Sequence, residues 1–148
     1  MSSHVRPDES LGFALKRLQQ VLRTRMDATL ATYTLTMPQY AVLALLAEHP
    51  GISNAELARR SFVAAPTMLR ILDGLTEAGL ITRADPVPEH RTRGTVLTNL
   101  GRKRLTQAAP HVQNFENLLV AKAGPEHLEV IMNWLRACAD QLGEQGLA

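Results

Sequence analysis

The chain has 148 residues, of which 45% are hydrophobic and 20% charged, a composition that indicates one globular domain and excludes a disordered chain. No apolar run approaches the roughly 18–20 residues that span a bilayer, and the N-terminus lacks the apolar stretch of a secretory signal. The formal net charge is only +2, and a single cysteine excludes an intrachain disulfide and fits a reducing cytoplasm. We therefore expect a cytoplasmic protein that has no membrane segment.

The first predicted element is a long amphipathic helix over residues 11–31. Aromatic residues make up only 4% of the chain, so aliphatic side chains must form the core, which favours helices. Apolar residues recur every three or four positions in this segment and form one stripe. The stripe consists of Leu11, Leu15, Leu18, Leu22, Met26 and Leu30.

Two shorter helices with marked N-terminal signals follow. Thr36 can cap the first, with Gln39 three residues later as in a capping box, and a proline occupies the first turn. Ser53 and Glu56 repeat this device at the second. A Pro-Gly pair breaks the chain between them. The predicted helices lie near residues 37–48 and 54–60.

A third helix and a hairpin are predicted next. The helix covers residues 65–78 and ends at Gly79. Its buried face is formed by Met68, Ile71, Leu72 and Leu75. Two β-prone segments, 80–83 and 94–97, then flank a proline-containing loop, which predicts a two-stranded hairpin with a long tip.

Two long helices complete the predicted fold. Thr98 can cap the first, which runs to about Ala121 and contains Pro110, where we expect a kink or fewer local hydrogen bonds. The last helix begins after Gly124, and its apolar residues step by three and four as in a heptad seam. The seam consists of Leu128, Ile131, Leu135, Cys138 and Leu142. We interpret Cys138 as a buried structural thiol on this seam.

Three short helices followed by a hairpin are the element order of a winged helix-turn-helix protein. In that fold the third helix enters the major groove of DNA, and the hairpin, or wing, reaches an adjacent groove or phosphates. Thr67 and Arg70 lie one turn apart on the third helix, so both can point at the same groove. Arg70 can then bind guanine or a phosphate. The alternative for Arg70 is an ordinary surface arginine or an ion pair with Asp73.

Charge is unevenly distributed along the chain. The segment from Arg83 to Arg104 holds six basic and two acidic residues and so carries +4, which leaves −2 on the rest. A local basic patch on a nearly neutral protein suits an anionic partner met by one surface. Charge alone supports a solvated surface loop about as well.

Five short strings, by their order and spacing, resemble the MarR (multiple-antibiotic-resistance regulator) family. The strings are Leu35–Tyr40, Leu57–Arg60, Thr67–Leu75, Gly79–Arg83 and Leu97–Gly101. The resemblance implies a mainly α fold with a small β-hairpin wing. It further implies a transcription regulator, expected to be a repressor, that binds a palindromic double-stranded operator as a homodimer. Release from DNA by a small aromatic or phenolic effector is implied as well.

The resemblance also implies one domain over residues 1–148. Residues 9–33 and 99–145 would form a helical dimerisation region, and residues 35–98 the winged helix-turn-helix head. Three long amphipathic helices offer more apolar surface than the head alone can cover, which supports the dimer. Packing of the same helices within one monomer is the alternative.

The predicted DNA-contacting residues combine the helix geometry with the resemblance. They are Gln39, Ser53, Pro66, Thr67, Arg70, Arg91 and Arg93. By resemblance, Arg91 is the wing arginine that enters the minor groove, and Arg93 is the second choice. The third helix begins unusually apolar, which predicts that thymine-methyl and backbone contacts take a larger share of binding.

No catalytic, cofactor, metal or ligand-binding residue is predicted. The five histidines lack ligand spacing, and no nucleophile elbow or phosphate loop is present, so an enzyme is not expected. Four residues are conceivable effector contacts but are better explained as core or surface, namely Arg17, Tyr33, Tyr40 and His111. The alternative function is a winged-helix module that binds protein, which the apolar start of the third helix favours and the basic wing disfavours.

Overall fold

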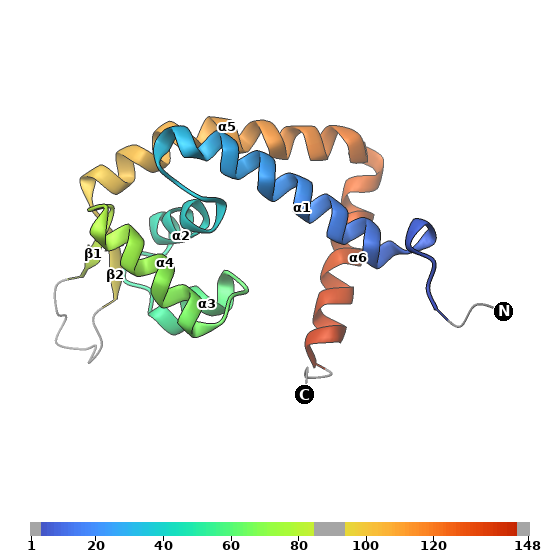
Figure 1. Ribbon diagram of the computed structural model, residues 1–148, viewed down its shortest axis with the longest axis horizontal. Helices are drawn as coiled ribbons and strands as arrows, with labels where there is room; N and C mark the ends of the chain where they lie inside the picture. The colour runs from blue at the N-terminus through green and yellow to red at the C-terminus, as the bar shows by residue number, and fades with distance from the viewer. Residues whose placement is uncertain (1–3, 85–93, 145–148) are drawn as a thin grey trace. The chain divides into compact units, whose positions relative to one another are not determined.

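The computed structural model describes residues 4–84 and 94–144. Its backbone is mostly helical, with one two-stranded antiparallel sheet (Figure 1). It forms two compact units, of which one ends at His111 and the other begins at Val112. In chain order the elements are η1 (Pro7–Glu9), α1 (Leu11–Leu30), η2 (Ala31–Tyr33), α2 (Met37–Glu48), α3 (Asn54–Arg60), α4 (Ala65–Glu77), β1 (Ile81–Arg83), β2 (Thr95–Leu97), α5 (Asn99–Ala123) and α6 (Pro125–Glu144).

The predicted N-terminal caps of α2 and α5 are confirmed. Thr36 Oγ1 accepts a hydrogen bond from Gln39 N at 3.3 Å, and Gln39 Oε1 accepts one from Thr36 N at 3.0 Å, so the capping box is complete. Thr98 Oγ1 accepts from Gly101 N at 3.0 Å and also donates to Gly79 O at 2.6 Å. Thr98 therefore caps α5 and ties it to the end of α4.

The N-terminal cap of α3 has only one of the two hydrogen bonds of the predicted capping box. Ser53 Oγ accepts from Glu56 N at 3.2 Å, as expected. The Glu56 carboxylate, however, binds the guanidinium groups of Arg59 and Arg60 on the next turn. Interpreting Glu56 as a capping residue was therefore wrong, because two cations one turn ahead bind its carboxylate.

The core of the first unit lies among α1, α2, α3, α4 and the hairpin. The predicted inward face of α4 is confirmed for Met68, Leu72 and Leu75, while Ile71 is half-buried. The largest side chains that are almost inaccessible to solvent are Leu30, Val42, Leu43, Leu46, Leu57, Met68, Leu75 and Leu80. This aliphatic core fixes α4 by its inner face and leaves its outer face to solvent.

Helix α4 ends at the predicted glycine. Gly79 has φ of +73°, its N–H donates to Thr76 O at 2.9 Å, and Leu80 N donates to Leu75 O at 3.0 Å. These two bonds form a Schellman motif, which favours glycine at the left-handed position. The buried Leu75 and Leu80 provide the apolar contact that accompanies such a motif.

The hairpin pairs as predicted and is also attached to the connection between α2 and α3. Its register places Ile81 opposite Leu97 and Arg83 opposite Thr95. Gly51 N donates to Thr95 O at 3.0 Å, and Thr95 N donates to Ile52 O at 3.4 Å. These backbone bonds join the root of the hairpin to the segment that leads into α3.

The second unit leaves most of its apolar side chains uncovered. Every residue of α6 whose exposure is described, except the half-buried Leu128, is exposed. The prediction that Cys138 is a buried thiol was wrong: Cys138 is exposed, and among the described residues so are Ile131, Leu135 and Leu142 of the same seam. Helix α5 continues through Pro110 as one helix.

Within residues 4–84 and 94–144, no single helix is long and apolar enough to cross a bilayer. One bent pair, Leu11–Tyr33 with Met37–Glu48 at 71°, reaches the required length and composition only when its two members are taken together.

Candidate nucleic-acid interface

The outer face of α4 is exposed on the helix-turn-helix. Its inner face packs on the core, so the remaining side chains project into solvent. The exposed residues of its first two turns and of the turn that follows are Ala65, Pro66, Thr67, Leu69, Arg70 and Asp73. Pro66, Thr67 and Arg70 of the predicted set therefore share one helix and one side of the head.

Arg70 is available to a partner molecule. Within the described part of the chain, no hydrogen bond or ion pair engages its guanidinium, and the alternative pair with Asp73 is not formed. An exposed, unpaired arginine near the centre of a helix face can donate bidentate hydrogen bonds to guanine or bind a phosphate.

The start of α4 has no side-chain cap. Ala64 occupies the N-cap position without a side-chain hydrogen bond, and Pro66 lies in the first turn. The free N–H groups of a helix N-terminus carry partial positive charge and favour phosphate groups. The apolar start of this helix, noted in the sequence, thus leaves its backbone donors open.

Two other predicted residues, Gln39 and Ser53, serve local structure. Gln39 uses its carbonyl oxygen in the α2 cap, and its Nε2 lies 3.3 Å from the position that a Cβ on Gly74 would take. Ser53 is exposed and uses its hydroxyl oxygen to cap α3. Arg91 and Arg93 lie outside the described residues.

The turn between α3 and α4 has a feature that the sequence analysis missed. Phe62 has φ of +56° and is 94% exposed. Phe62 N donates to Arg59 O and Val63 N to Ala58 O, which forms a Schellman motif with phenylalanine where glycine is usual. A bulky residue in this conformation is strained, and such strain is found disproportionately at functional sites. No glycine marks this turn, so the sequence carried no signal for it.

A cavity of about 400 Å³ lies beside this turn, between α1, the start of α2 and α4. Ser61 Oγ is buried there and has no hydrogen-bond partner among the described residues. Arg23 also lines the cavity, and its Nε is 3.7 Å from Asp27 Oδ2, a loose ion pair. Phe62 also borders this cavity, although the residue is almost fully exposed. The site thus combines a cation and an unpaired hydroxyl.

The four residues considered as effector contacts lie elsewhere. Tyr33 Oη and His111 Nε2 are 2.7 Å apart and join η2 to α5, and Arg104 donates to Tyr33 O at 2.6 Å. Tyr40 is half-buried, and burial raises the pKa of its hydroxyl. Arg17 is exposed. Of these four, the cavity beside the turn contains none.

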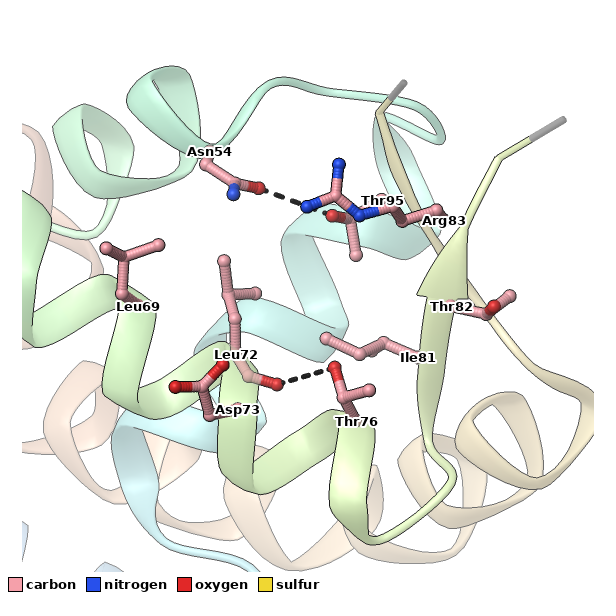
Figure 2. Close-up of a pocket in the computed structure, with 9 residues that line it drawn as sticks. All are labelled: Asn54, Leu69, Leu72, Asp73, Thr76, Ile81, Thr82, Arg83 and Thr95. Carbon is pink, nitrogen blue, oxygen red and sulfur yellow. Dashed lines mark hydrogen bonds between the residues drawn. The ribbon is translucent and has the colours of Figure 1, made fainter. Parts of the chain in front are cut away.

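A second groove, of about 380 Å³, separates α4 from the root of the hairpin. Figure 2 shows Leu69 and Asp73 on the α4 side, and Thr82 and Arg83 on the strand. Thr95 Oγ1 donates to Asn54 Oδ1 at 3.3 Å across one end of the groove. The groove therefore opens between the two elements that a winged helix-turn-helix protein presents to DNA.

Surface electrostatics around α3 are dominated by one cluster. Hydrogen bonds from Arg59 and Arg60 lower the pKa of Glu56 to about 2, and the carboxylate in turn raises the pKa of Arg59. His49 Nε2 lies 3.0 Å from Arg60 Nη1 at the edge of this cluster. Across residues 4–84 and 94–144, no group of three or more histidine, cysteine or acidic side chains could hold a metal ion.

Comparison with known sequences identifies relatives over most of the chain. The model of the MarR family matches residues 35–87. The HTH-type transcriptional repressor Rv2887 of Mycobacterium tuberculosis (strain ATCC 25618 / H37Rv) is 34% identical over 115 residues. That alignment covers 78% of this chain and 83% of the repressor.

Two solved structures extend the comparison to the fold. The transcriptional repressor CouR bound to a 23-mer DNA duplex superposes with a TM-score of 0.78 at 29% identity, covering 93% of this chain and 99% of CouR. The Mycobacterium tuberculosis protein Rv2887 in complex with salicylic acid superposes with a TM-score of 0.67 at 28% identity, covering 93% and 99%.

Proposed function

Since the chain belongs to the MarR family of transcription regulators, we propose that it acts as a repressor by binding a palindromic DNA operator as a homodimer. The observation that carries this proposal is the outer face of α4, where Pro66, Thr67 and Arg70 are exposed on a helix held from behind by the core. A repressor of similar fold, CouR, has been solved on duplex DNA. Such a regulator acts in the cytoplasm.

In this proposal α4 enters the major groove. Arg70 contacts guanine or a phosphate, Thr67 lies one turn before it, and the uncapped start of α4 faces the DNA backbone. Ser53 and the Nε2 of Gln39 contribute from the starts of α3 and α2. The family resemblance adds minor-groove contacts from the wing arginines, Arg91 and Arg93.

The homodimer accounts for the apolar side chains that this chain leaves uncovered. Exposed patches of this kind mark interfaces. On α1 they are Leu11, Phe13, Leu15, Leu18 and Val21, and on α6 they are Val130, Ile131, Met132, Trp134, Leu135 and Leu142. We accordingly assign residues 9–33 and 99–145 to dimerisation and residues 35–98 to the DNA-binding head.

The effector in this proposal is a small aromatic acid bound in the cavity beside the α3–α4 turn. Salicylic acid is bound to the relative Rv2887. Here the Arg23 guanidinium can exchange its loose pair with Asp27 for the ligand carboxylate, and Ser61 can donate its unused hydroxyl. Because the turn leads directly into α4, ligand binding there acts on the DNA-reading helix.

The DNA-binding part is tested with duplex DNA from upstream of the protein's own gene, by fluorescence anisotropy at two salt concentrations. We expect tight binding that weakens steeply with salt, as phosphate contacts require. Arg70→Ala should cost about 1–3 kcal/mol. Arg25→Ala, an exposed arginine of α1, is the matched control and should bind as the parent does. No binding at low salt would refute the proposal.

The effector part is tested with salicylate as the probe. Salicylate should raise the melting temperature of the parent protein and weaken its DNA binding. Arg23→Ala should remove both effects, whereas Arg25→Ala, two residues away on the same helix, should retain them. If Arg23→Ala responds like the parent, the cavity is not the salicylate site.

A further inference from the structure

Arg83 occupies an unusual place on the hairpin. Side chains alternate between the faces of a strand, so Ile81 and Arg83 share one face of β1. Ile81 is buried against the head together with Leu97, its partner on β2. Arg83 therefore projects from the inner face of the sheet, beside Thr95 opposite it, and lines the groove between β1 and α4.

The Arg83 guanidinium has no partner within the described residues. No hydrogen bond or ion pair engages it there, although Asp73 lines the same groove. Figure 2 places the Asp73 carboxylate beside Leu72, at the α4 wall. An arginine on the inner face of a sheet without a carboxylate partner is suited to bind an anion from outside the chain.

Thr95 orients the side chain of Asn54, which lines the same groove. The buried Thr95 hydroxyl donates to Asn54 Oδ1 at 3.3 Å, which leaves the two Nδ2 hydrogens free to donate. Residues directly opposite on antiparallel strands have Cβ atoms about 4.5–5.5 Å apart, so the long Arg83 side chain can reach the Asn54 amide from its position opposite Thr95. The two donors thus face one end of the groove.

The geometry of bound DNA indicates which anion would lie in the groove between α4 and the hairpin. When α4 lies in the major groove and the hairpin reaches the adjacent minor groove, the sugar-phosphate strand that separates these grooves must run between α4 and the hairpin. The groove lined by Asn54, Leu69 and Arg83 lies between these two elements. The negative charge of Asp73 disfavours a phosphate at the α4 wall of the groove. A phosphate is therefore favoured at the end that Asn54 and Arg83 occupy.

We propose that Asn54 and Arg83 together bind one backbone phosphate of the DNA strand that separates the two grooves, with Thr95 as the positioning residue for Asn54. This inference rests on the proposed DNA-binding function and adds two residues to it. The contact carries no base preference, but it fixes the register of the head on the duplex.

The experiment uses a duplex recovered from a random library by the parent protein, in which single phosphates are replaced by neutral methylphosphonates. The parent should lose about tenfold in affinity when the bound phosphate is neutralised, the loss of one hydrogen-bonded charge. Arg83→Gln should show a similar loss on unmodified DNA, a salt slope lower by about 1, and no further loss at that one phosphate. Arg70→Ala should keep the sensitivity at that phosphate.

Variants at position 95 test the positioning role. Thr95→Ser retains the hydroxyl and should preserve the methylphosphonate profile, whereas Thr95→Val should reduce the effect of neutralising that phosphate. Circular dichroism and the effect of Arg70→Ala in each background report whether the fold is intact.

Two results would overturn the inference. If neutralising each phosphate lowers the affinity of Arg83→Gln by the same factor as that of the parent, Arg83 binds no phosphate. If Asn54→Ala keeps the full effect at the phosphate lost in Arg83→Gln, the two residues do not share a ligand. Failure of the parent to recover any duplex would instead refute the proposed function itself, and the inference with it.

Discussion

The helix-turn-helix head and helix α6 are built from similar aliphatic residues that meet opposite environments. Leu43 and Leu57 in the head are 0% exposed, whereas Leu135 and Leu142 on α6 are 37% and 66% exposed. Burying one such side chain is worth about 1.5–3 kcal/mol. The head therefore draws its stability from its own chain, and α6 must draw much of its stability from a partner.

The largest expected effect tests the self-sufficiency of the head. Leu43→Ala removes a fully buried side chain and should lower the free energy of unfolding by about 2–5 kcal/mol. The same change at the exposed Leu142 should cost less than about 1 kcal/mol. Urea denaturation followed by circular dichroism measures both. Equal losses would mean that the two regions do not differ as described.

The second prediction concerns glycine. A Cβ on Gly101 would lie 2.0 Å from Leu80 O, so Gly101→Ala must displace the backbone and should cost about 1–3 kcal/mol. Gly12, on the exposed α1, has its nearest neighbour, Ser10 Oγ, at 3.7 Å, so Gly12→Ala should stabilise by up to about 1 kcal/mol. In thermal melts, Gly101→Ala should have a lower melting temperature than the parent and Gly12→Ala a higher one.

The third prediction tests the uncovered face of α6. Ile131→Lys places a charge on the proposed dimer interface and should weaken dimerisation at least about tenfold. Glu129→Lys, two residues away on the same helix, also introduces a lysine, with a larger change of charge, and serves as the control. Sedimentation velocity over a dilution series measures the dimer Kd. An unchanged Kd in Ile131→Lys would remove α6 from the interface.

The smallest effect is expected at the Glu56 cluster on the surface of α3. Its hydrogen bonds to Arg59 and Arg60 lower the pKa of Glu56 from 4.5 to about 2. A carboxyl whose pKa is lower in the folded state stabilises above the unfolded value and loses that contribution as pH falls. The stability advantage of the parent over Glu56→Gln should thus be small at pH 7 and vanish between about pH 4.5 and pH 2. A pH-independent difference would contradict this.

Sequence signals predicted the local structure of the head well, because its caps and stops are built from neighbouring residues. The capping box of Thr36 and Gln39 and the glycine stop at Gly79 mark helix boundaries that the structure retains. The two β-prone segments likewise predicted the hairpin, whereas its register, with Ile81 opposite Leu97, came from the structure.

Contacts between distant segments could not be predicted in this way. The pairing of Gly51 with Thr95 and the cavity beside Ser61 arise only when several elements meet. Phe62 takes a left-handed conformation without the glycine that usually signals it. The burial of Cys138 was inferred from the apolar seam alone. Such a pattern does not show whether the residues that cover it belong to the same chain.

The backbone bonds between Thr95 and the Gly51–Ile52 segment have a consequence for how a head leaves DNA. They join the hairpin root to the connection before α3, and the α3–α4 turn continues that connection into the DNA-reading helix. We therefore expect α4 and the hairpin root to move together. In the proposed complex, an effector that tilts α4 would then withdraw the hairpin as well, and the DNA contacts of both elements should be lost in a single step.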